Sequence, residues 1–114
     1  MSSPAEVAVE RRGGSVVAHV SGEIDMTNAT YLREQLLDST PNDALALVVD
    51  ISGCRYLDSA AIEVLFDLSR RLERRRQELR LVMPPSSPLK RVIELTEIRT
   101  AAPVYESLDT ALSQ

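Results

Sequence analysis

The sequence predicts an α/β fold: one small mixed β-sheet, opened by an antiparallel N-terminal hairpin and continued by parallel strands, with about four α-helices packed on it. Three observations predict this fold. Two strand-like segments flank a glycine pair, strand-like and helical segments alternate after them, and residues 45–51 form a nearly continuous apolar run. Such alternation favours parallel pairing with right-handed crossovers, and such a run is typical of a strand covered on both faces. At 114 residues, we expect one domain, 1–114.

The first two elements are predicted to form a β-hairpin. Residues 5–10 alternate in part between apolar and polar side chains, and residues 15–21 (SVVAHVS) are dense in β-branched valine. Between them, Gly13-Gly14 provides the conformational freedom that a tight turn requires. Two such segments, separated by a glycine-bearing turn, indicate paired antiparallel strands.

Helical periodicity appears twice after the hairpin. A first helix is expected from Ala29 onward, with Thr27 and Asn28 as candidate N-caps, and it ends before Pro41. The second begins at Ser59 and shows an apolar stripe opposite charged residues. This stripe contains Ala61, Ile62, Val64, Leu65, Leu68 and Leu72. The remaining expected elements are a strand 79–83, a helix that begins at Ser87-Pro88, a short strand 104–105 and a closing helix 106–112.

Composition and charge exclude several classes of function. Thirteen basic and seventeen acidic residues leave a net charge of −4, which offers no general attraction to nucleic acid, and aromatic residues are only 4%. No apolar run approaches the roughly 18 residues of a membrane span, and residues 1–10 lack the features of a signal peptide. The single cysteine, Cys54, cannot form an internal disulfide and suits a reducing compartment. We therefore expect a cytoplasmic protein with no direct binding to nucleic acid and none to membranes.

Three stretches of the sequence resemble a known family. Residues 22–25 (GEID) with 28–29 (NA), residues 48–53 (VVDISG) with 56–59 (YLDS), and residues 104–112 (VYESLDTAL) are similar to STAS domains of anti-sigma-factor antagonists. The stretches occur in the family's order and without large insertions, so the resemblance covers essentially the whole chain. It implies the STAS fold, which agrees with the α/β prediction.

The resemblance also implies a function. Antagonists of this family bind an anti-sigma factor that is also a serine kinase, which frees a sigma factor for transcription. The kinase inactivates the antagonist by phosphorylating the serine that follows the loop aspartate, and a serine phosphatase restores it. Here these residues are Asp58 and Ser59. The family usually has glycine two positions after the serine, whereas this chain has Ala60 and Ala61, which favour a helix more strongly than glycine does. We expect Asp58, Ser59, Ala60 and Ala61 to contact the partner.

The position of Ser59 is chemically suited to such a switch. A helix start has unpaired N–H groups and a partial positive charge, which accommodate a phosphate within the domain itself. A phosphate in the middle of an interface, with no cation beside it, would prevent docking. The alternative interpretation is that Ser59 or Asp58 is simply the N-cap of the helix, and both roles can hold at once.

Acidic residues before the first helix are a second candidate contact. Parallel strand order is expected to place Glu23 and Asp25 at the same edge of the sheet as Asp58, where they would contact basic residues of a partner. Alternatively, they are solvated charges that complement the helix dipole. Asn28 is included among the candidate contacts, although its residue type and position favour a cap.

Other residues are expected to be structural. His19 lacks a second metal ligand nearby, Cys54 lacks a CxxC partner, and the arginines at 70–76 are interleaved with Glu73, as on a solvated helix end. No phosphate-binding or GxSxG motif is present, so we expect neither catalysis, nor a cofactor, nor a metal. Two alternative functions stay open: a constitutive scaffold or subunit of a signalling or lipid-transport complex, and a module that binds a small ligand. The expected oligomeric state is a monomer or a weak dimer.

Overall fold

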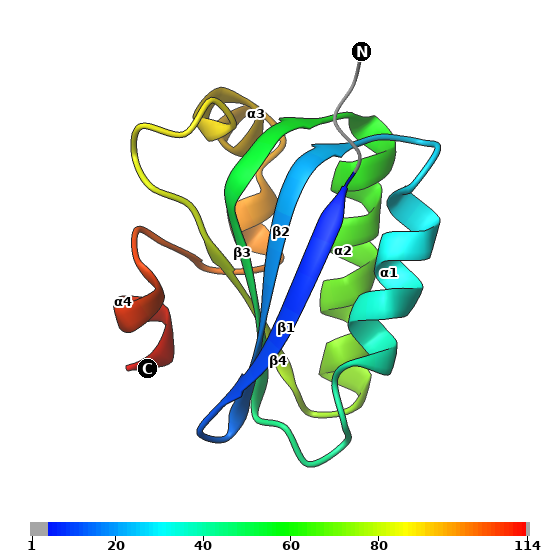
Figure 1. The fold of residues 1–114 in the computed structure, drawn as a ribbon, viewed down its shortest axis with the longest axis vertical. Coiled ribbons are helices and arrows are strands. Elements are labelled where there is room, and N and C mark those ends of the chain that lie inside the picture. The colour runs from blue at the N-terminus through cyan, green and yellow to red at the C-terminus, as the bar shows by residue number, and fades with distance from the viewer. Residues whose placement is uncertain (1–4, 114) are drawn as a thin grey trace.

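The protein has one five-stranded mixed sheet whose strand order follows the order of the chain, β1-β2-β3-β4-β5. It is seen in a computed structural model that describes residues 5–113 (Figure 1). The strands are β1 (Glu6–Arg12), β2 (Ser15–Ile24), β3 (Ala46–Leu57), β4 (Glu78–Val82) and β5 (Val104–Tyr105). β1 and β2 are antiparallel and all later pairs are parallel, which confirms the predicted fold class.

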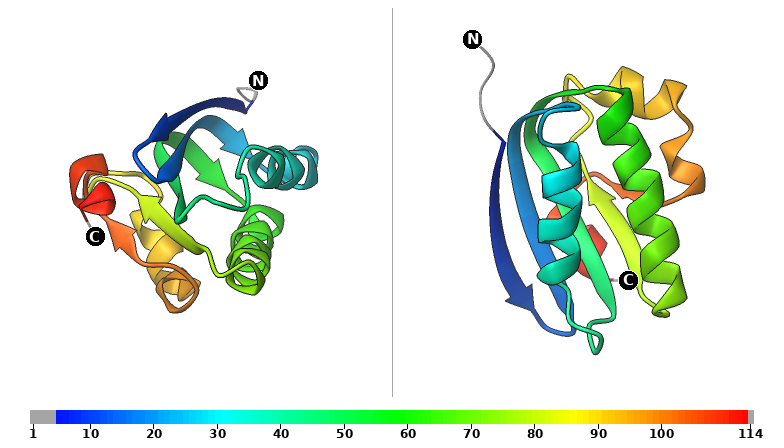
Figure 2. Two further views of the ribbon diagram at one scale, coloured as in Figure 1. Left: turned by 90° about the horizontal axis from the view of Figure 1, so that it is seen from below. Right: turned by 90° about the vertical axis from the view of Figure 1, so that its right-hand side faces the viewer.

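The helices cover both faces of this sheet unequally. They are α1 (Ala29–Asp38), α2 (Ser59–Arg74), α3 (Lys90–Leu95) and α4 (Leu108–Leu112), and a 3-10 helix spans Ile98–Thr100. The first three helices pack on one face and α4 lies on the other, as the two views of Figure 2 show. The short α4 leaves the outer face of β1 uncovered.

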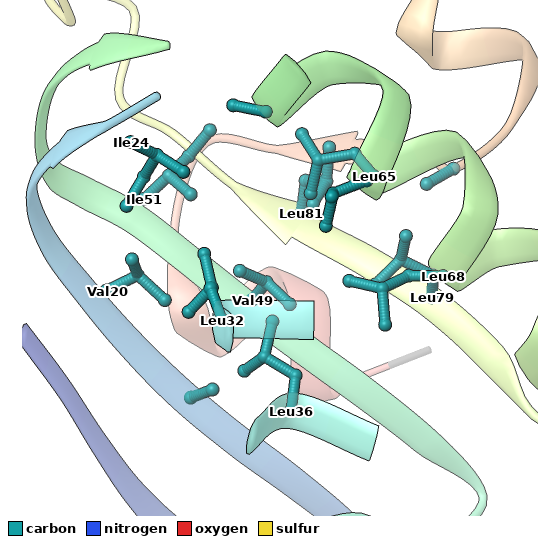
Figure 3. Close-up of a cluster of buried hydrophobic side chains, with 14 of the residues drawn as sticks. Val20, Ile24, Leu32, Leu36, Val49, Ile51, Leu65, Leu68, Leu79 and Leu81 are labelled. Carbon is teal, nitrogen blue, oxygen red and sulfur yellow. The ribbon is translucent and has the colours of Figure 1, made fainter. Parts of the chain in front are cut away.

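Most apolar side chains are buried between the sheet and α1, α2 and α3. Leu36 of α1, Leu68 of α2 and Val49 of β3 lie in this layer and are at most 1% exposed (Figure 3). The predicted stripe of α2 lies entirely inside it. On the other face, Val17 and Val48 pack against α4 in a smaller cluster. β3 is therefore covered on both faces, as its apolar sequence predicts.

The hairpin turn has the geometry that its glycines allow. Gly13 has φ +61°, in the left-handed region, and is the first of two residues between the paired Arg12 and Ser15. A positive φ at this position fits a type II′ turn, whose twist matches that of antiparallel strands. The turn fixes the register of β1 against β2.

Several element boundaries differ from the predicted ones. β2 and β3 extend to Ile24 and Leu57 because they continue to pair past two irregularities, one of them next to Gly22, which has φ +93°. Ser87-Pro88 precedes a turn, and α3 begins only at Lys90, so Ser87 is not its N-cap. Instead, the Ser87 hydroxyl accepts a hydrogen bond from the Leu89 N–H at 3.0 Å. The prediction about a signal peptide concerns in part residues 1–4, which lie outside the described residues.

Candidate functional site

Asp58 joins two loops at the carboxyl end of the parallel strands. Its Oδ1 accepts a hydrogen bond from the Ala61 N–H at 3.0 Å, which makes Asp58 the N-cap of α2. Its Oδ2 accepts a bond from the Met26 N–H at 3.0 Å, in the loop between β2 and α1. In addition, the Asp58 N–H donates to the Ile24 carbonyl at 3.2 Å. Asp58 thus holds the start of α2 against the loop between β2 and α1.

Ser59 is the first residue of α2 and is exposed. Its hydroxyl makes no hydrogen bond with any described residue, so capping belongs to Asp58 and the Ser59 side chain is available. Ala60 is half-buried beside it. Ala61 is only 2% exposed and packs in the core, which corrects the expectation that its side chain contacts a partner. Its N–H is used by Asp58, so Ala61 supports the site from beneath.

The loop between β2 and α1 lies beside Asp58, which confirms the predicted proximity of Glu23 and Asp25 to that residue. Glu23 and Ile24 pair with the end of β3, directly before Asp58. Asp25 Oδ1 accepts bonds from the Thr27 hydroxyl at 2.5 Å and the Thr27 N–H at 2.9 Å. These bonds stabilise the ionised form and lower the pKa of the Asp25 carboxyl.

Asn28 stands at the N-cap position of α1, but its side chain does not cap the helix. Its Oδ1 accepts a bond from the Asp25 N–H at 3.0 Å, and its Nδ2 donates to the Glu23 carbonyl at 3.0 Å. The predicted N-cap position is therefore confirmed, but the side-chain capping bond is absent because the amide is turned back toward the end of β2. Asn28 fixes the backbone of the loop that Asp58 also holds.

Met26 is the one residue of this site that sequence reasoning did not identify. It is 78% exposed, an unusual environment for a large apolar side chain, and its backbone is held by Asp58. A pattern based on helices or strands could not identify it, because it lies in a loop and its contact with Asp58 spans 32 residues.

An open groove of about 580 Å³ runs from this site between α1 and α2. Its lining includes Met26, Ala60 and Glu63 near Ser59, and Arg33 and Asp67 farther along. Asp67 Oδ2 accepts hydrogen bonds from Arg71 at 2.8 Å and from Arg33 at 3.3 Å. Although desolvation opposes ionisation, the bond from Arg71 and the nearby arginines lower the pKa of Asp67. The Arg33–Asp67 ion pair thus bridges the groove from α1 to α2.

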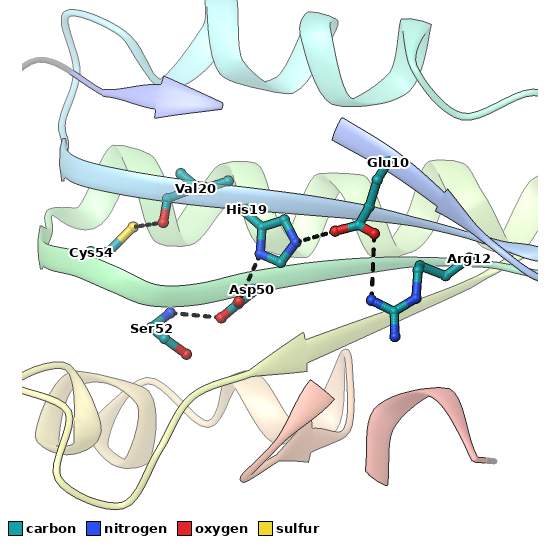
Figure 4. Close-up of polar contacts among 7 residues, drawn as sticks. All are labelled: Glu10, Arg12, His19, Val20, Asp50, Ser52 and Cys54. Atoms are coloured by element: carbon teal, nitrogen blue, oxygen red, sulfur yellow. Dashed lines mark hydrogen bonds and ion pairs between the residues drawn. The ribbon is translucent and has the colours of Figure 1, made fainter. Parts of the chain in front are cut away.

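His19 forms a separate polar cluster on the outer face of the sheet. Its Nε2 lies 2.7 Å from Glu10 Oε2 on β1, and its Nδ1 lies 2.9 Å from Asp50 Oδ2 on β3 (Figure 4). The hydrogen bond with Glu10 is the main cause of a raised pKa of His19, since it favours the imidazolium. The cluster links three strands, which agrees with a structural role for His19.

Cys54 lies farther along β3 than Asp50, opposite Gly22 of β2, and is buried. Its Sγ–H donates to the Val20 carbonyl at 3.3 Å, and burial raises the pKa of the thiol to about 12. A thiol of this kind is not a nucleophile at neutral pH.

Within residues 5–113, His, Cys, Asp and Glu side chains form no group of three or more that could hold a metal ion. None of the helices in the described part of the chain is long and apolar enough to cross a membrane.

The geometry can be compared with that of known proteins. The family model of the STAS domain matches residues 6–111. The crystal structure of an anti-sigma factor antagonist from Mycobacterium paratuberculosis is 32% identical in sequence, with a TM-score of 0.80 over 99% of this chain and 97% of that one. The anti-sigma-F factor antagonist RsfB of Mycobacterium tuberculosis is 28% identical over 99% of this chain and 93% of its own length.

More distant structures share the fold. Unphosphorylated SpoIIAA, an anti-sigma factor antagonist, superposes with a TM-score of 0.71 over 94% of this chain and 93% of its own, at 15% identity. The relatives named here are regulatory factors rather than enzymes. Because the family model spans nearly the whole chain and the nearer relatives align end to end, the chain belongs to the STAS family, among the anti-sigma-factor antagonists.

Proposed function

We propose that this protein binds an anti-sigma factor with serine kinase activity and that phosphorylation of Ser59 ends the binding. The observation that carries the proposal is that two neighbouring residues at the start of α2 have different roles. Asp58 caps the helix, and the exposed Ser59 hydroxyl has no partner among the described residues. A serine that merely capped the helix would use its hydroxyl for that purpose.

The proposed contact surface consists of Glu23, Asp25, Asn28, Asp58, Ser59 and Ala60, to which the structure adds Met26. Met26 offers an exposed apolar side chain beside the hydroxyl, and Asp25 offers a carboxylate. Apolar contacts at the centre of an interface, with charges around them, are the common arrangement in protein complexes. Ser59 would lie within this surface when the partner is bound.

Phosphorylation would change the surface rather than the fold. The phosphate would stand at the N-terminus of a 16-residue helix, where the dipole and free N–H groups accommodate its charge. It would also stand next to the carboxylate of Asp58 and four residues before Glu63, on the same side of α2. A partner that approached this surface would have to bury a dianion among carboxylates, and this is costly enough to prevent docking.

The exchange would take place in the cytoplasm, where sigma factors act, and a serine phosphatase would return phospho-Ser59 to its active form. A small ligand inserted between the sheet and the helices, one form of the alternative function, finds no room in the described core. The space between the sheet and the helices, lined by Leu36, Val49 and Leu65 among others, amounts to about 10 Å³. A nucleotide or a fatty acid needs several hundred Å³.

The proposal can be tested with wild-type protein, Ser59→Ala and Ser59→Glu as baits in host lysate, followed by calorimetry with the purified captured kinase. We expect the kinase to bind wild type and Ser59→Ala, and its affinity for Ser59→Glu to fall by about 100-fold or more. Ser113→Glu is the matched control, because it adds the same charge at an exposed serine remote from α2. Equal binding to all baits would instead indicate a constitutive subunit.

A further inference from the structure

The outer edge of β1 presents backbone groups that nothing in the described chain covers. β1 is the first strand in the sheet order and pairs on one side only, with β2. The right-hand view of Figure 2 shows β1, in dark blue, as the free margin of the sheet. An edge of this kind is a template for pairing with another strand.

The hairpin determines which backbone groups face outward. Arg12 and Ser15 flank a two-residue turn, and the pair that closes such a turn is hydrogen-bonded. Every second residue before Arg12 is therefore bonded to β2 as well. The residues between them, Val7, Val9 and Arg11, direct their N–H and C=O groups away from the sheet.

The sequence of β1 (EVAVERR) is complementary to itself in the antiparallel direction. When Val9 lies opposite Val9 of a second copy, Glu6 lies opposite Arg12 of that copy, and Ala8 lies opposite Glu10. The outward-facing residues then form the hydrogen-bonded pairs, Val9 with Val9 and Val7 with Arg11. Opposite charges in directly facing positions stabilise a strand pair, and the two-fold symmetry provides the Glu6–Arg12 pair twice.

Charge also disfavours the neighbouring symmetric registers. A two-fold axis through Ala8 would place Glu6 opposite Glu10, and an axis through Glu10 would place that residue opposite itself. Like charges in facing positions are destabilising. The register centred on Val9 is thus the one that the charges of β1 select.

The side chains concerned are available. Val9 is 43% exposed on the helix-covered side of the sheet, although Val7 beside it packs against the core. Glu6 is exposed and makes no ion pair with any described residue. Arg12 has 44% of its side chain exposed and lies 3.4 Å from Glu10 of its own strand, so it can still receive a second carboxylate.

From these observations we propose that β1 is a self-association surface, through which two copies join their sheets into one, with a two-fold axis at Val9. A single strand pair buries less area than a standard stable interface, so the dimer is weak and depends on concentration. Because the two copies run in opposite directions, their Ser59 surfaces lie at opposite ends of the joined sheet. The dimer is thus able to hold two partners at once. This proposal does not depend on the identity of the partner.

Sedimentation velocity of the full chain, from about 10 μM to about 1 mM, tests the proposal. Glu6→Arg and Arg12→Glu each place like charges opposite one another twice, and each is expected to weaken the dimer by about ten-fold or more. The combination of both substitutions restores opposite charges, so the double variant is expected to dimerise as wild type does. Glu94→Arg makes the same charge change on α3 and is expected to leave the dimer unchanged. Circular dichroism verifies that each variant is folded.

Backbone pairing has a second readout. Val9→Pro removes an outward N–H without removing a bond to β2, and it is expected to abolish the dimer. In wild type, amide exchange of Val7, Val9 and Arg11 is expected to slow as concentration rises. A protein that is monomeric up to 1 mM, or a dimer insensitive to these variants, would overturn the proposal. So would a strand of a different protein that binds β1 while the chain alone stays monomeric.

Discussion

Replacement of Asp58 by alanine separates the structural role of this residue from the proposed switch. The substitution removes the cap of α2, which is worth about 1 kcal/mol, and the bond to the Met26 N–H, which is worth about another 1 kcal/mol at a half-exposed position. Both bonds are 3.0 Å long in the structure. We therefore expect Asp58→Ala to lower the free energy of unfolding by about 2 kcal/mol.

A second variant divides this sum. Asp58→Asn keeps one oxygen for the cap, but its amide nitrogen cannot accept from Met26, so the expected loss is about 1 kcal/mol. Urea unfolding followed by circular dichroism measures both values, with the slope unchanged from wild type. Asp43→Ala is the control: its side chain is 80% exposed and 3.7 Å from Arg11, so its loss should stay below about 0.5 kcal/mol. If Asp58→Ala is no more destabilising than this control, the two hydrogen bonds of Asp58 do not stabilise the fold.

Two further predictions concern titratable groups outside the site. Because its folded pKa is raised by Glu10 and Asp50, His19 contributes stability that is fully present below its unfolded pKa of about 6.5 and is lost as pH rises through the folded value. The difference in Tm between wild type and His19→Gln should therefore shrink from about pH 6 to about pH 8. A difference that stays constant with pH would show that the ion pairs of His19 with Glu10 and Asp50 do not stabilise the fold. Cys54, with a pKa of about 12, should resist a thiol reagent in the native protein and react fully in urea. Rapid labelling of the native protein would show that the Cys54 thiol is neither buried nor bonded to the Val20 carbonyl.

Most of the fold could be predicted from the sequence because the apolar patterns of single segments agree with their positions in the folded chain. The apolar run of β3 and the stripe of α2 both predict burial, and both are buried. Boundaries were less accurate where tertiary pairing decides them. β3 continues to Leu57 because β2 still offers partners, and Ile98–Thr100 forms a 3-10 turn after Glu97, whose φ of +56° no pattern of apolar residues indicates.

The residues of the candidate site also fall into those that the sequence could identify and those that it could not. Asp58 and Ser59 could be found because a helix start after a strand has a recognisable sequence, and the resemblance to a family added the expected role of the serine. Met26 and the turned amide of Asn28 could not be found, since both depend on contacts that cross from one loop to another. Ala61 was expected both in the apolar stripe of α2 and at the contact with a partner, and the structure agrees only with the stripe, because the helix turns this side chain into the core.

The strand order of the sheet, which repeats the order of the chain, bears on how the protein is made. Every strand pairs with the one synthesised immediately before it, and no strand has to be inserted between two that already exist. The hairpin can form as soon as β2 leaves the ribosome, and each later unit of helix and strand is added to a finished edge. During translation, no strand therefore has to wait for a pairing strand that is synthesised much later. This limits the time that the apolar strand β3 is exposed to aggregation.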